Sequence, residues 1–206
     1  MARKNLTPEA VILAAADLAD ETDFGRVTLS EVARRLGVQT ASLYNHVRDR
    51  DQLLTGIHEL ALDDLADRIG AAIAGRAGRD ALIGLAEAER AFAHDCPGRW
   101  AALQQPAAAS TVASEGAVRV ATLTMAVLRG YALPEEELVH VTRMLGATIN
   151  GFLALERSGG FGHRPPDPQV SWHRTLAALD AIIRIWPVPE IPASPAPAKP
   201  RERPPT

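Results

Sequence analysis

Apolar residues recur at intervals of three and four along almost the whole chain, and this spacing limits its fold more than any other feature. Side chains at these intervals lie on one face of an α-helix, whereas a half-buried strand needs strict alternation of apolar and polar residues. Alternating runs of Val, Ile, Thr and aromatic residues are missing. The spacing therefore predicts an all-α protein of about nine helices.

Capping signals mark the first four predicted helices. A Thr-Pro-Glu run at 7–9 is typical of a helix N-terminus. A capping box at 28–31 begins a second helix that should stop at Gly37, and a third short helix is expected over 41–46. A near capping box at 49–52 begins a longer fourth helix, whose inner face comprises Leu54, Ile57, Ala61, Leu65, Ile69 and Ile73.

The rest of the chain divides into further helices and a proline-rich end. Helices are expected at about 80–94, 97–104, 110–130, 135–157 and 170–186. From Pro187 onward 8 of 20 residues are proline, which predicts a disordered or polyproline-like tail.

The composition narrows the class of protein and its compartment. Apolar residues make up 47% of the 206 residues, which excludes a disordered chain. Cys96 is the single cysteine, so no internal disulfide can form and a reducing compartment is expected. No apolar run reaches about 18 residues, and no long apolar segment follows the basic N-terminus. These features predict a soluble cytoplasmic protein with no membrane partner.

Positive charge is concentrated in one short segment. The chain has a net charge of −3, but residues 26–50 contain five Arg against two acidic residues. Over 28–47 this segment consists of helix, glycine-centred turn and helix, which together with the first helix would form a helix-turn-helix unit. Leu43 and Val47 would anchor its last helix, leaving small and hydroxylated residues free to approach base edges and phosphates. A helical hairpin that only builds a core is the alternative.

Residues 28–54, T-L-S-E-V-A-R-R-L-G-V-Q-T-A-S-L-Y-N-H-V-R-D-R-D-Q-L-L, resemble the DNA-binding module of the TetR family of bacterial transcriptional regulators. The pattern L-G-V-x-x-x-S/T-L-Y-x-H-V-x-D/N-K/R-x-x-L-L is matched without a gap from Leu36 to Leu54. The resemblance implies a homodimer with a helix-turn-helix domain at 1–50 and a ligand-binding and dimerisation domain at 51–187. The proline-rich tail would occupy 188–206.

The match also implies which residues contact DNA: Thr28, Ser30, Arg34, Thr40, Ala41, Ser42, Tyr44, His46 and Arg50. Residues that open the third helix would read bases, and those at helix ends would bond phosphate or sugar, with Arg50 clamping the DNA backbone. Residue-level alternatives stay open. Tyr44 could be a lid on the small core, His46 could form a local hydrogen bond, and Arg34 could simply solvate the second helix.

The body resembles the C-terminal region of a large TetR subgroup that carries a GF…LE…GGF block, here within 135–161. In that family the last two long helices pair across a two-fold axis, and Gly146 and Gly151 would allow close helix approach. Two apolar stripes suit this interface, with the core of one subunit as their alternative: Leu138, Met144, Leu145, Ile149, Phe152 and Leu155, and Trp172, Leu176, Leu179, Ile183 and Trp186.

The resemblance implies a ligand pocket in the body. Candidate lining residues are large or polar residues on faces expected to be buried: Phe92, His94, Trp100, Leu103, Met125, Leu128 and Asn150. Ala66 stands where the tetracycline repressor uses a histidine, so tetracycline–metal sensing is not implied. The pattern predicts a ligand-responsive repressor that a small-molecule effector releases from a palindromic operator in double-stranded DNA, with no cofactor.

Two other classes of protein fit the sequence less well. Glu137 and His140 have the E-x-x-H spacing of di-iron bundles, but those sites need a second such pair and the sequence contains none. A helical dimerisation or scaffold protein would not need the hydroxyl and basic residues of 28–50. We therefore predict neither enzyme activity nor a metal site.

Overall fold

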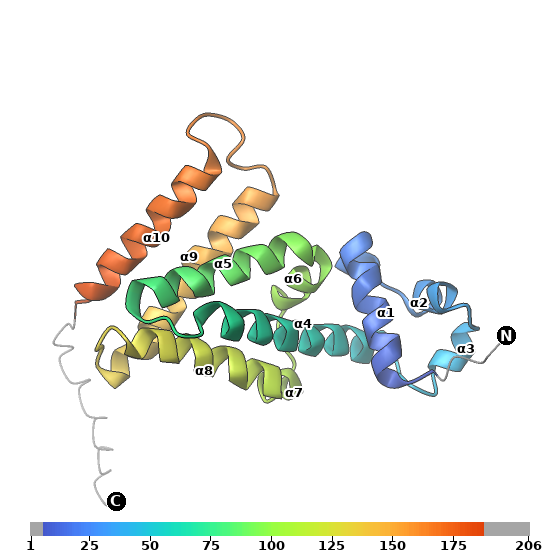
Figure 1. The fold of residues 1–206 in the computed structure, drawn as a ribbon. Coiled ribbons are helices and arrows are strands. Elements are labelled where there is room, and N and C mark those ends of the chain that lie inside the picture. The colour runs from blue at the N-terminus through green and yellow to red at the C-terminus, as the bar shows by residue number, and fades with distance from the viewer. Residues whose placement is uncertain (1–5, 188–206) are drawn as a thin grey trace, which may run out of the picture.

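The computed structural model describes residues 6–187, and every regular element in that range is helical (Figure 1). The N-terminal elements are α1 (Pro8–Glu21), the 3-10 turn η1 (Phe24–Arg26), α2 (Leu29–Leu36) and α3 (Thr40–Leu43). The body comprises α4 (Arg50–Ile73), α5 (Gly78–Asp95), α6 (Pro97–Leu103), α7 (Ala109–Val112), α8 (Glu115–Arg129), η2 (Glu135–Glu137), α9 (Leu138–Arg157) and α10 (Pro168–Arg184).

The all-α prediction is confirmed, with two corrections to the predicted helices. The segment expected as one helix over 110–130 is two helices, α7 and α8, separated at Ser114. The Ser114 hydroxyl caps α8 by accepting a hydrogen bond from the Ala117 N–H at 3.3 Å. The third helix is shorter than 41–46, because the α-helix ends at Leu43 and 44–46 continue as a turn.

α1, α2 and α3 form a small unit around one core. Thr28 caps α2 through its hydroxyl, and α2 ends at Leu36, followed by Gly37, whose φ of 69° is left-handed. The buried side chains that join the three helices include Val11, Ala15, Val32 and Leu43.

α4 belongs to both halves of the molecule. Leu53 and Ile57 are buried in the core of α1–α3, whereas Leu65 and Ile69 are buried in the core of the body. Along α4 the packing passes from the N-terminal core to the core of the body between Leu60 and Ala61, and a single helix of 24 residues connects the halves. The predicted domain division at residue 50 stays a prediction, and the proline-rich segment 188–206 lies outside the described residues.

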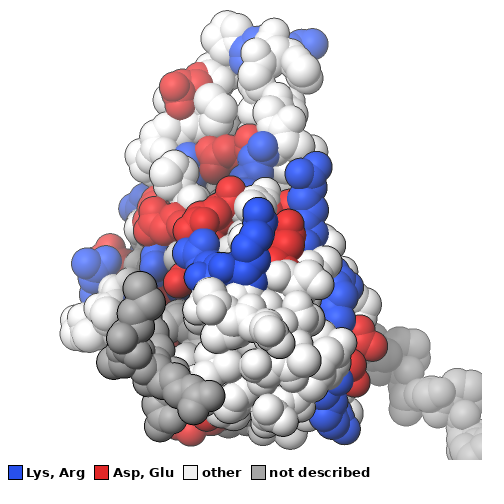
Figure 2. All heavy atoms as spheres, turned by 90° about the vertical axis from the view of Figure 1, so that its right-hand side faces the viewer, with Lys and Arg blue, Asp and Glu red and all other residues white. Residues whose placement is uncertain are grey.

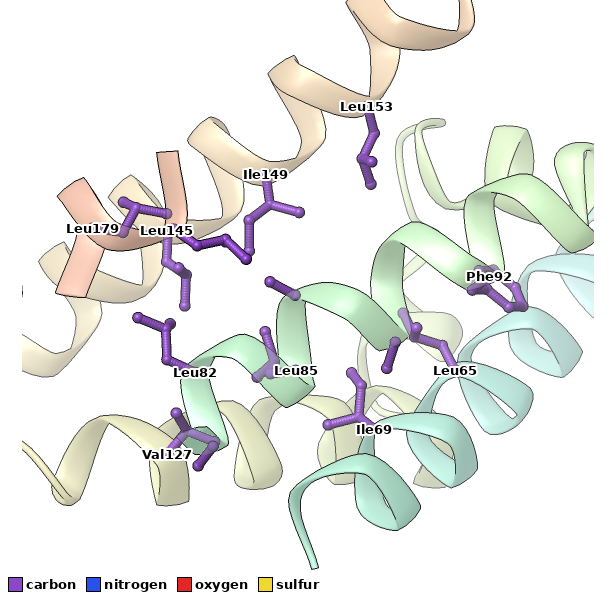
Figure 3. Packing of buried hydrophobic residues seen from close by; sticks show 14 of the residues in the cluster. Leu65, Ile69, Leu82, Leu85, Phe92, Val127, Leu145, Ile149, Leu153 and Leu179 are labelled. Carbon is purple, nitrogen blue, oxygen red and sulfur yellow. The ribbon is translucent and has the colours of Figure 1, made fainter. Parts of the chain in front are cut away.

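The core of the body contains most of the two apolar stripes predicted for dimerisation. Figure 3 shows Leu82 and Leu85 of α5 facing Leu145 and Ile149 of α9, with Leu179 of α10 beside them. Seven stripe residues are at most 3% exposed within one subunit: Leu138, Leu145, Ile149, Trp172, Leu176, Leu179 and Ile183. The prediction that they face a second subunit is wrong, because α9 and α10 turn these residues towards α5 and towards each other. Leu155 is the stripe residue that stays exposed, at 52%.

The E-x-x-H pair is separated by its surroundings. Glu137 is buried, and its Oε2 accepts a hydrogen bond from the Trp186 indole N–H at 2.7 Å, whereas His140 is exposed. Across residues 6–187, no group of three or more His, Cys, Asp or Glu side chains could hold a metal ion. Glu137 thus ties the end of α10 to the start of α9.

α6 approaches α1 more closely than a side chain would allow. A Cβ added to Gly98 would lie 2.1 Å from the carbonyl carbon of Ala19. The N–H groups of Gly98 and Arg99 both donate to Asp20 Oδ1, each at 2.8 Å. The start of α6 is therefore fixed on the N-terminal unit.

The predicted close approach at Gly146 and Gly151 does not occur within the subunit. A Cβ built at either glycine would have nothing within 4 Å. Their contact with a second subunit stays a prediction.

One helical stretch, Glu135–Arg157, is long and apolar enough to cross a membrane, a test that core helices of soluble proteins also pass. The expectation of no such stretch was therefore too strict. Its residues Val141, Leu145 and Ile149 are buried in the core of the body, so packing against the rest of the protein accounts for its apolar character.

Candidate DNA interface and ligand cavity

The segment from α2 to α3 is held together by its turn. The Val38 N–H donates to the Ala33 carbonyl at 3.0 Å, and the Val47 N–H donates to the Leu43 carbonyl at 2.9 Å. Leu43 and Val47 are buried, as predicted, so α3 is anchored from beneath. Its outer face points to solvent at one end of the molecule (Figure 1).

The residues predicted to read DNA lie on that outer face. Exposed or half-buried residues there are Thr40, Ala41, Ser42, Tyr44, Asn45 and His46. Tyr44 is 56% exposed, so it is not a lid on the core. Among the described residues, the histidine rings with hydrogen-bond partners are those of His94 and His173, so the His46 ring is open to a partner such as a phosphate.

The arginines on α2 differ in their freedom. The Arg34 side chain is 79% exposed, and its partner oxygen on Glu31 is 3.7 Å away. Arg35 instead donates two hydrogen bonds to Glu21, at 2.6 and 2.7 Å. Arg34 is therefore the better placed of the two to meet a phosphate. Ser30 is also exposed, in the first turn of α2.

Arg50 has an intramolecular role that the sequence did not indicate. Its Nε donates to the Val27 carbonyl at 2.8 Å, and its Nη2 donates to the Gly25 carbonyl at 3.0 Å. These bonds hold the loop before α2 against the start of α4. The predicted clamp on the DNA backbone stays a prediction, and it would use the free edge of the guanidinium.

The charge on this end of the molecule is uneven. Figure 2 shows Lys and Arg side chains in a band with Asp and Glu side chains beside it, and a mostly uncharged surface below the band. Arg26, Arg34, Arg48 and Arg50 are exposed residues of this unit. Residues 40–46 include hydroxyl side chains and no Lys, Arg, Asp or Glu, so their exposed surface suits contact with base edges, while the exposed arginines around it suit contact with phosphates.

A cavity of about 220 Å³ lies among five helices of the body: α4, α5, α6, α8 and α9. Four of the predicted ligand residues line it, namely Phe92, Trp100, Leu103 and Asn150. Gln104, at the end of α6, donates its amide to Asn150 Oδ1 at 3.1 Å. Most of the remaining wall is apolar, formed by Leu62, Leu65 and Val120.

Two titratable residues of the cavity wall were missed by the sequence analysis, and neither has a hydrogen bond or ion pair with a described residue. His58 is buried at 8% exposure, and burial lowers its pKa. Burial raises the pKa of Glu89, on α5, to about 7. The sequence did contain a signal for both residues. His58 interrupts the apolar helix face formed by positions 54, 58, 61 and 65, and Glu89 interrupts the one formed by positions 82, 85, 89 and 92.

Three predicted ligand residues lie away from this cavity. Leu128 is fully buried in the body core, Met125 is half-buried on α8 outside the cavity lining, and the His94 side chain is 89% exposed. A larger surface groove of about 670 Å³ passes His94. Its charged groups already have partners, such as Arg90 with Glu156 at 2.5 Å, so it offers less to a ligand.

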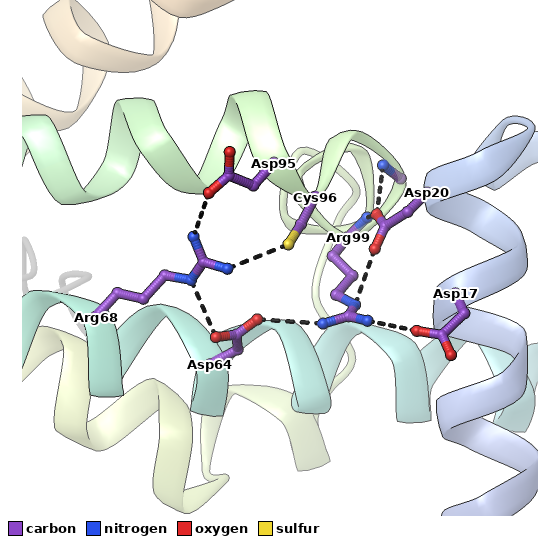
Figure 4. Close-up of polar contacts among 8 residues, drawn as sticks. Asp17, Asp20, Asp64, Arg68, Asp95, Cys96 and Arg99 are labelled. Atoms are coloured by element: carbon purple, nitrogen blue, oxygen red, sulfur yellow. Dashed lines mark hydrogen bonds and ion pairs between the residues drawn. The ribbon is translucent and has the colours of Figure 1, made fainter.

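Figure 4 shows the charged cluster that joins the cavity helices to α1. Arg99 of α6 binds Asp17 of α1 at 2.7 Å and Asp64 of α4 at 3.2 Å. Arg68 of α4 binds Asp64 at 3.1 Å and Asp95 at 3.0 Å. The cluster couples α1, α4, α5 and α6 through partly buried charges.

An anchored, outward-facing helix-turn-helix joined to a larger helical body is the arrangement of a DNA-binding transcriptional regulator. The family model of bacterial regulatory proteins of the tetR family matches residues 11–55, and the tetracyclin repressor-like C-terminal domain matches residues 82–179. The HTH-type transcriptional regulator Rv0681 of Mycobacterium tuberculosis is 31% identical over 159 residues, covering 75% of this chain and 72% of that protein. The chain belongs to the TetR family, and it is a regulator rather than an enzyme.

Solved structures share the fold. BioQ of Mycobacterium smegmatis aligns with a TM-score of 0.68 at 17% identity, covering 87% of this chain and 99% of that one. A TetR variant from Acinetobacter baumannii AYE, solved in complex with minocycline, aligns with a TM-score of 0.62 at 20% identity, covering 87% and 95%.

Proposed function

We propose that this regulator is a homodimeric repressor that binds a palindromic operator and leaves it when a small molecule enters the cavity among α4, α5, α6, α8 and α9. The observation that carries the proposal is the position of α6. Trp100 and Leu103 of this helix line the cavity, while its first turn holds Asp20 of α1.

DNA recognition is assigned to the outer face of α3 and its flanks. Thr40, Ala41 and Ser42 would read bases, and Tyr44 and His46 would bond phosphate or sugar. Thr28, Ser30, Arg34 and the free edge of Arg50 would contact the phosphates on either side. A cytoplasmic location belongs to this proposal, because the protein must reach the chromosome.

Dimerisation is assigned to the faces of α9 and α10 that point away from the core. Small and apolar exposed residues form these faces: Ala147, Gly151, Ala154 and Leu155 on α9, Ala178, Ala181 and Ile182 on α10, and Ile185 directly after α10. α9 and α10 lie side by side at the edge of the molecule (Figure 1). Self-association over a two-fold axis would bury them and set two recognition helices about 34–36 Å apart.

Coupling between cavity and DNA would run through α6 as well as α4. A ligand that displaces Trp100 shifts α6, and Asp20, bonded to the start of α6, transmits the shift to α1. Because operator spacing is fixed, a displacement of one recognition helix relative to the other lowers affinity. Couplings of about 5–150-fold are typical. The minocycline complex of the structural neighbour supports a ligand site in this fold, but Ala66 argues against the same drug chemistry here.

Sequencing of genomic fragments retained by the purified protein tests the DNA part of the proposal. The expected result is enrichment of one palindromic motif, and a variant with Thr40→Ala and Ser42→Ala should enrich a different motif. Retention without any common motif, or enrichment unchanged in the variant, would contradict the assigned recognition face.

A further inference from the structure

We propose that the effector is a small organic cation, a protonated amine on a compact apolar or aromatic body, whose ammonium group binds Glu89 inside the cavity. This inference rests on the proposed function, because it names the class of ligand that the cavity takes.

The cavity wall contains one acidic side chain, Glu89, and no Lys or Arg, and its one histidine is His58. Its apolar surface comes from residues such as Leu65, Phe92 and Trp100, and Glu89 contributes the only carboxylate of the lining. No described residue donates a hydrogen bond to that carboxylate or pairs with it. Glu89 is half-buried, and a charge held partly out of water without a partner is unfavourable, so a bound donor with a positive charge gains both an ion pair and a hydrogen bond.

The other polar groups of the wall fit the same ligand. His58 is 8% exposed and has no hydrogen-bond partner among the described residues, and its lowered pKa keeps the ring neutral, so one ring nitrogen can accept a hydrogen bond from the ligand. Asn150 Oδ1 already accepts from Gln104. An anionic ligand would instead meet Glu89 with no compensating cation in the lining.

Two arginines lie near the cavity but behind its aromatic wall. Arg68 stacks over the Phe92 ring and Arg157 over the Trp100 ring, with centroid distances of 5.4 and 5.2 Å. Arg68 is neutralised by Asp64 and Asp95, and Arg157 donates to the Ala93 carbonyl at 2.6 Å. Both are therefore engaged outside the lining and do not supply an anion site within it.

The volume sets the size of the ligand. At about 220 Å³ the cavity is smaller than the roughly 300–1,000 Å³ of drug-sized sites. A single ring with a short aminoalkyl chain matches this volume and places an aromatic face beside Phe92 and Trp100.

Calorimetric titration with three probes of similar size tests the class: 2-phenylethylammonium, neutral 2-phenylethanol and anionic phenylacetate. At pH 8 we expect the cation to bind wild-type protein about tenfold or more tightly than either other probe, the value of one charged hydrogen bond. Glu89→Gln should remove this preference while leaving 2-phenylethanol binding unchanged. Glu136→Gln, which removes an exposed carboxylate outside the cavity, is the matched control.

A second experiment measures the affinity for the cation as a function of pH. His58, on α4, is the other titratable group of the lining, so the effects of Glu89 and His58 must be told apart. Lowering the pH from 8 to 6 should weaken cation binding to wild-type protein, because Glu89 gains a proton. In the Glu89→Gln variant, the change in cation affinity between pH 8 and pH 6 arises from His58 alone, and it should be smaller than in the wild-type protein.

The outcomes separate this inference from the proposed release mechanism. Equal or tighter binding of phenylacetate or 2-phenylethanol, cation affinity unchanged in Glu89→Gln, or no binding of the cation at millimolar concentration would overturn the cationic class. Glu89-dependent binding of the cation that leaves operator affinity unchanged would support the class and contradict release through this cavity.

Discussion

At the scale of single residues, two charged side chains show how context decides a role. Arg50 matches a family position expected to hold DNA, yet two of its nitrogens bind the Val27 and Gly25 carbonyls. Glu89 lies on an apolar helix face, and no described side chain pairs with it. An unpaired carboxylate at such a position lowers the stability of the folded protein. We interpret Glu89 as a ligand contact because no side chain of the described residues compensates its charge.

The cost of Glu89 predicts a pH dependence of stability. Its pKa rises from 4.5 to about 7 on folding, so the folded state holds the proton more tightly. Its stabilising contribution is therefore complete below about pH 4.5 and is lost as pH rises through about 7. We expect Glu89→Gln to be more stable than wild type at pH 8 by about 1–3 kcal/mol, with a smaller difference at pH 5. Urea unfolding at both pH values measures this, and a constant difference would contradict it.

Arg34 and Arg50 should respond differently to truncation. Arg34→Ala should weaken binding to every duplex sequence alike and make the log–log salt dependence shallower by about one, without changing the unfolding midpoint. Arg50→Ala should also lower the free energy of unfolding, by about 1 kcal/mol or more, because two carbonyls lose their donors. Salt-series binding assays and urea unfolding separate the effects. An unfolding midpoint of Arg50→Ala equal to that of the wild-type protein would contradict the structural role of Arg50 and leave only its contact with DNA.

At the scale of helices, α6 is short but has two contrasting faces. Its first turn meets α1 through Gly98 and the cluster around Arg99, while Trp100 and Leu103 face the cavity. In the N-terminal core, Ala102 packs with residues of α1 and α4. α6 is therefore a second connection between the halves, beside the continuous α4.

The close approach at Gly98 predicts a specific sensitivity. Gly98→Ala would force a Cβ within 2.1 Å of the α1 backbone, which cannot move aside as a flexible side chain can. We expect a loss of about 3 kcal/mol or more in the free energy of unfolding, and uncoupling of ligand binding from DNA binding. Gly70→Ala in α4 is the matched control, because its Cβ meets only Leu123 Cδ1 at 3.9 Å. That change should be neutral or stabilising by up to about 1 kcal/mol, and equal effects at both sites would contradict the argument.

At the scale of the whole molecule, the exposed faces of α9 and α10 remain after the core has been filled. Ile182 is 42% exposed and Ile185 is 78% exposed, next to a run of alanines. A subunit that keeps apolar residues exposed on two adjacent helices gains by covering them with a second copy.

The dimer face can be tested with one charge. Ile182→Glu should convert the dimer to a monomer at micromolar concentration and weaken operator binding, because a two-fold interface would bury the new carboxylate twice. Val118→Glu, at another exposed apolar site, on α8, should remain dimeric. Light scattering coupled to gel filtration gives the mass of each. A dimeric Ile182→Glu variant would place the interface elsewhere.

Local chemistry made a large part of this protein predictable. The capping residues Thr7 and Thr28 belong to signals that act within one turn, and the buried anchors Leu43 and Val47 follow from helical spacing alone. The spacing of the recognition segment was specific enough to indicate the family. Four cavity residues, Phe92 and Trp100 among them, were found because large side chains on inner faces gather wherever helices converge.

Only the tertiary structure decided which inner face meets which neighbour. The stripes of α9 and α10 indicated burial but not the partner, and the fold used most of them within the subunit. The contact at Gly98 and the bonds of Arg50 join residues far apart in the chain, and no local pattern records such pairs. Spacing along a helix specifies how a side chain points relative to its neighbours in sequence. What it points at depends on where the other helices pack.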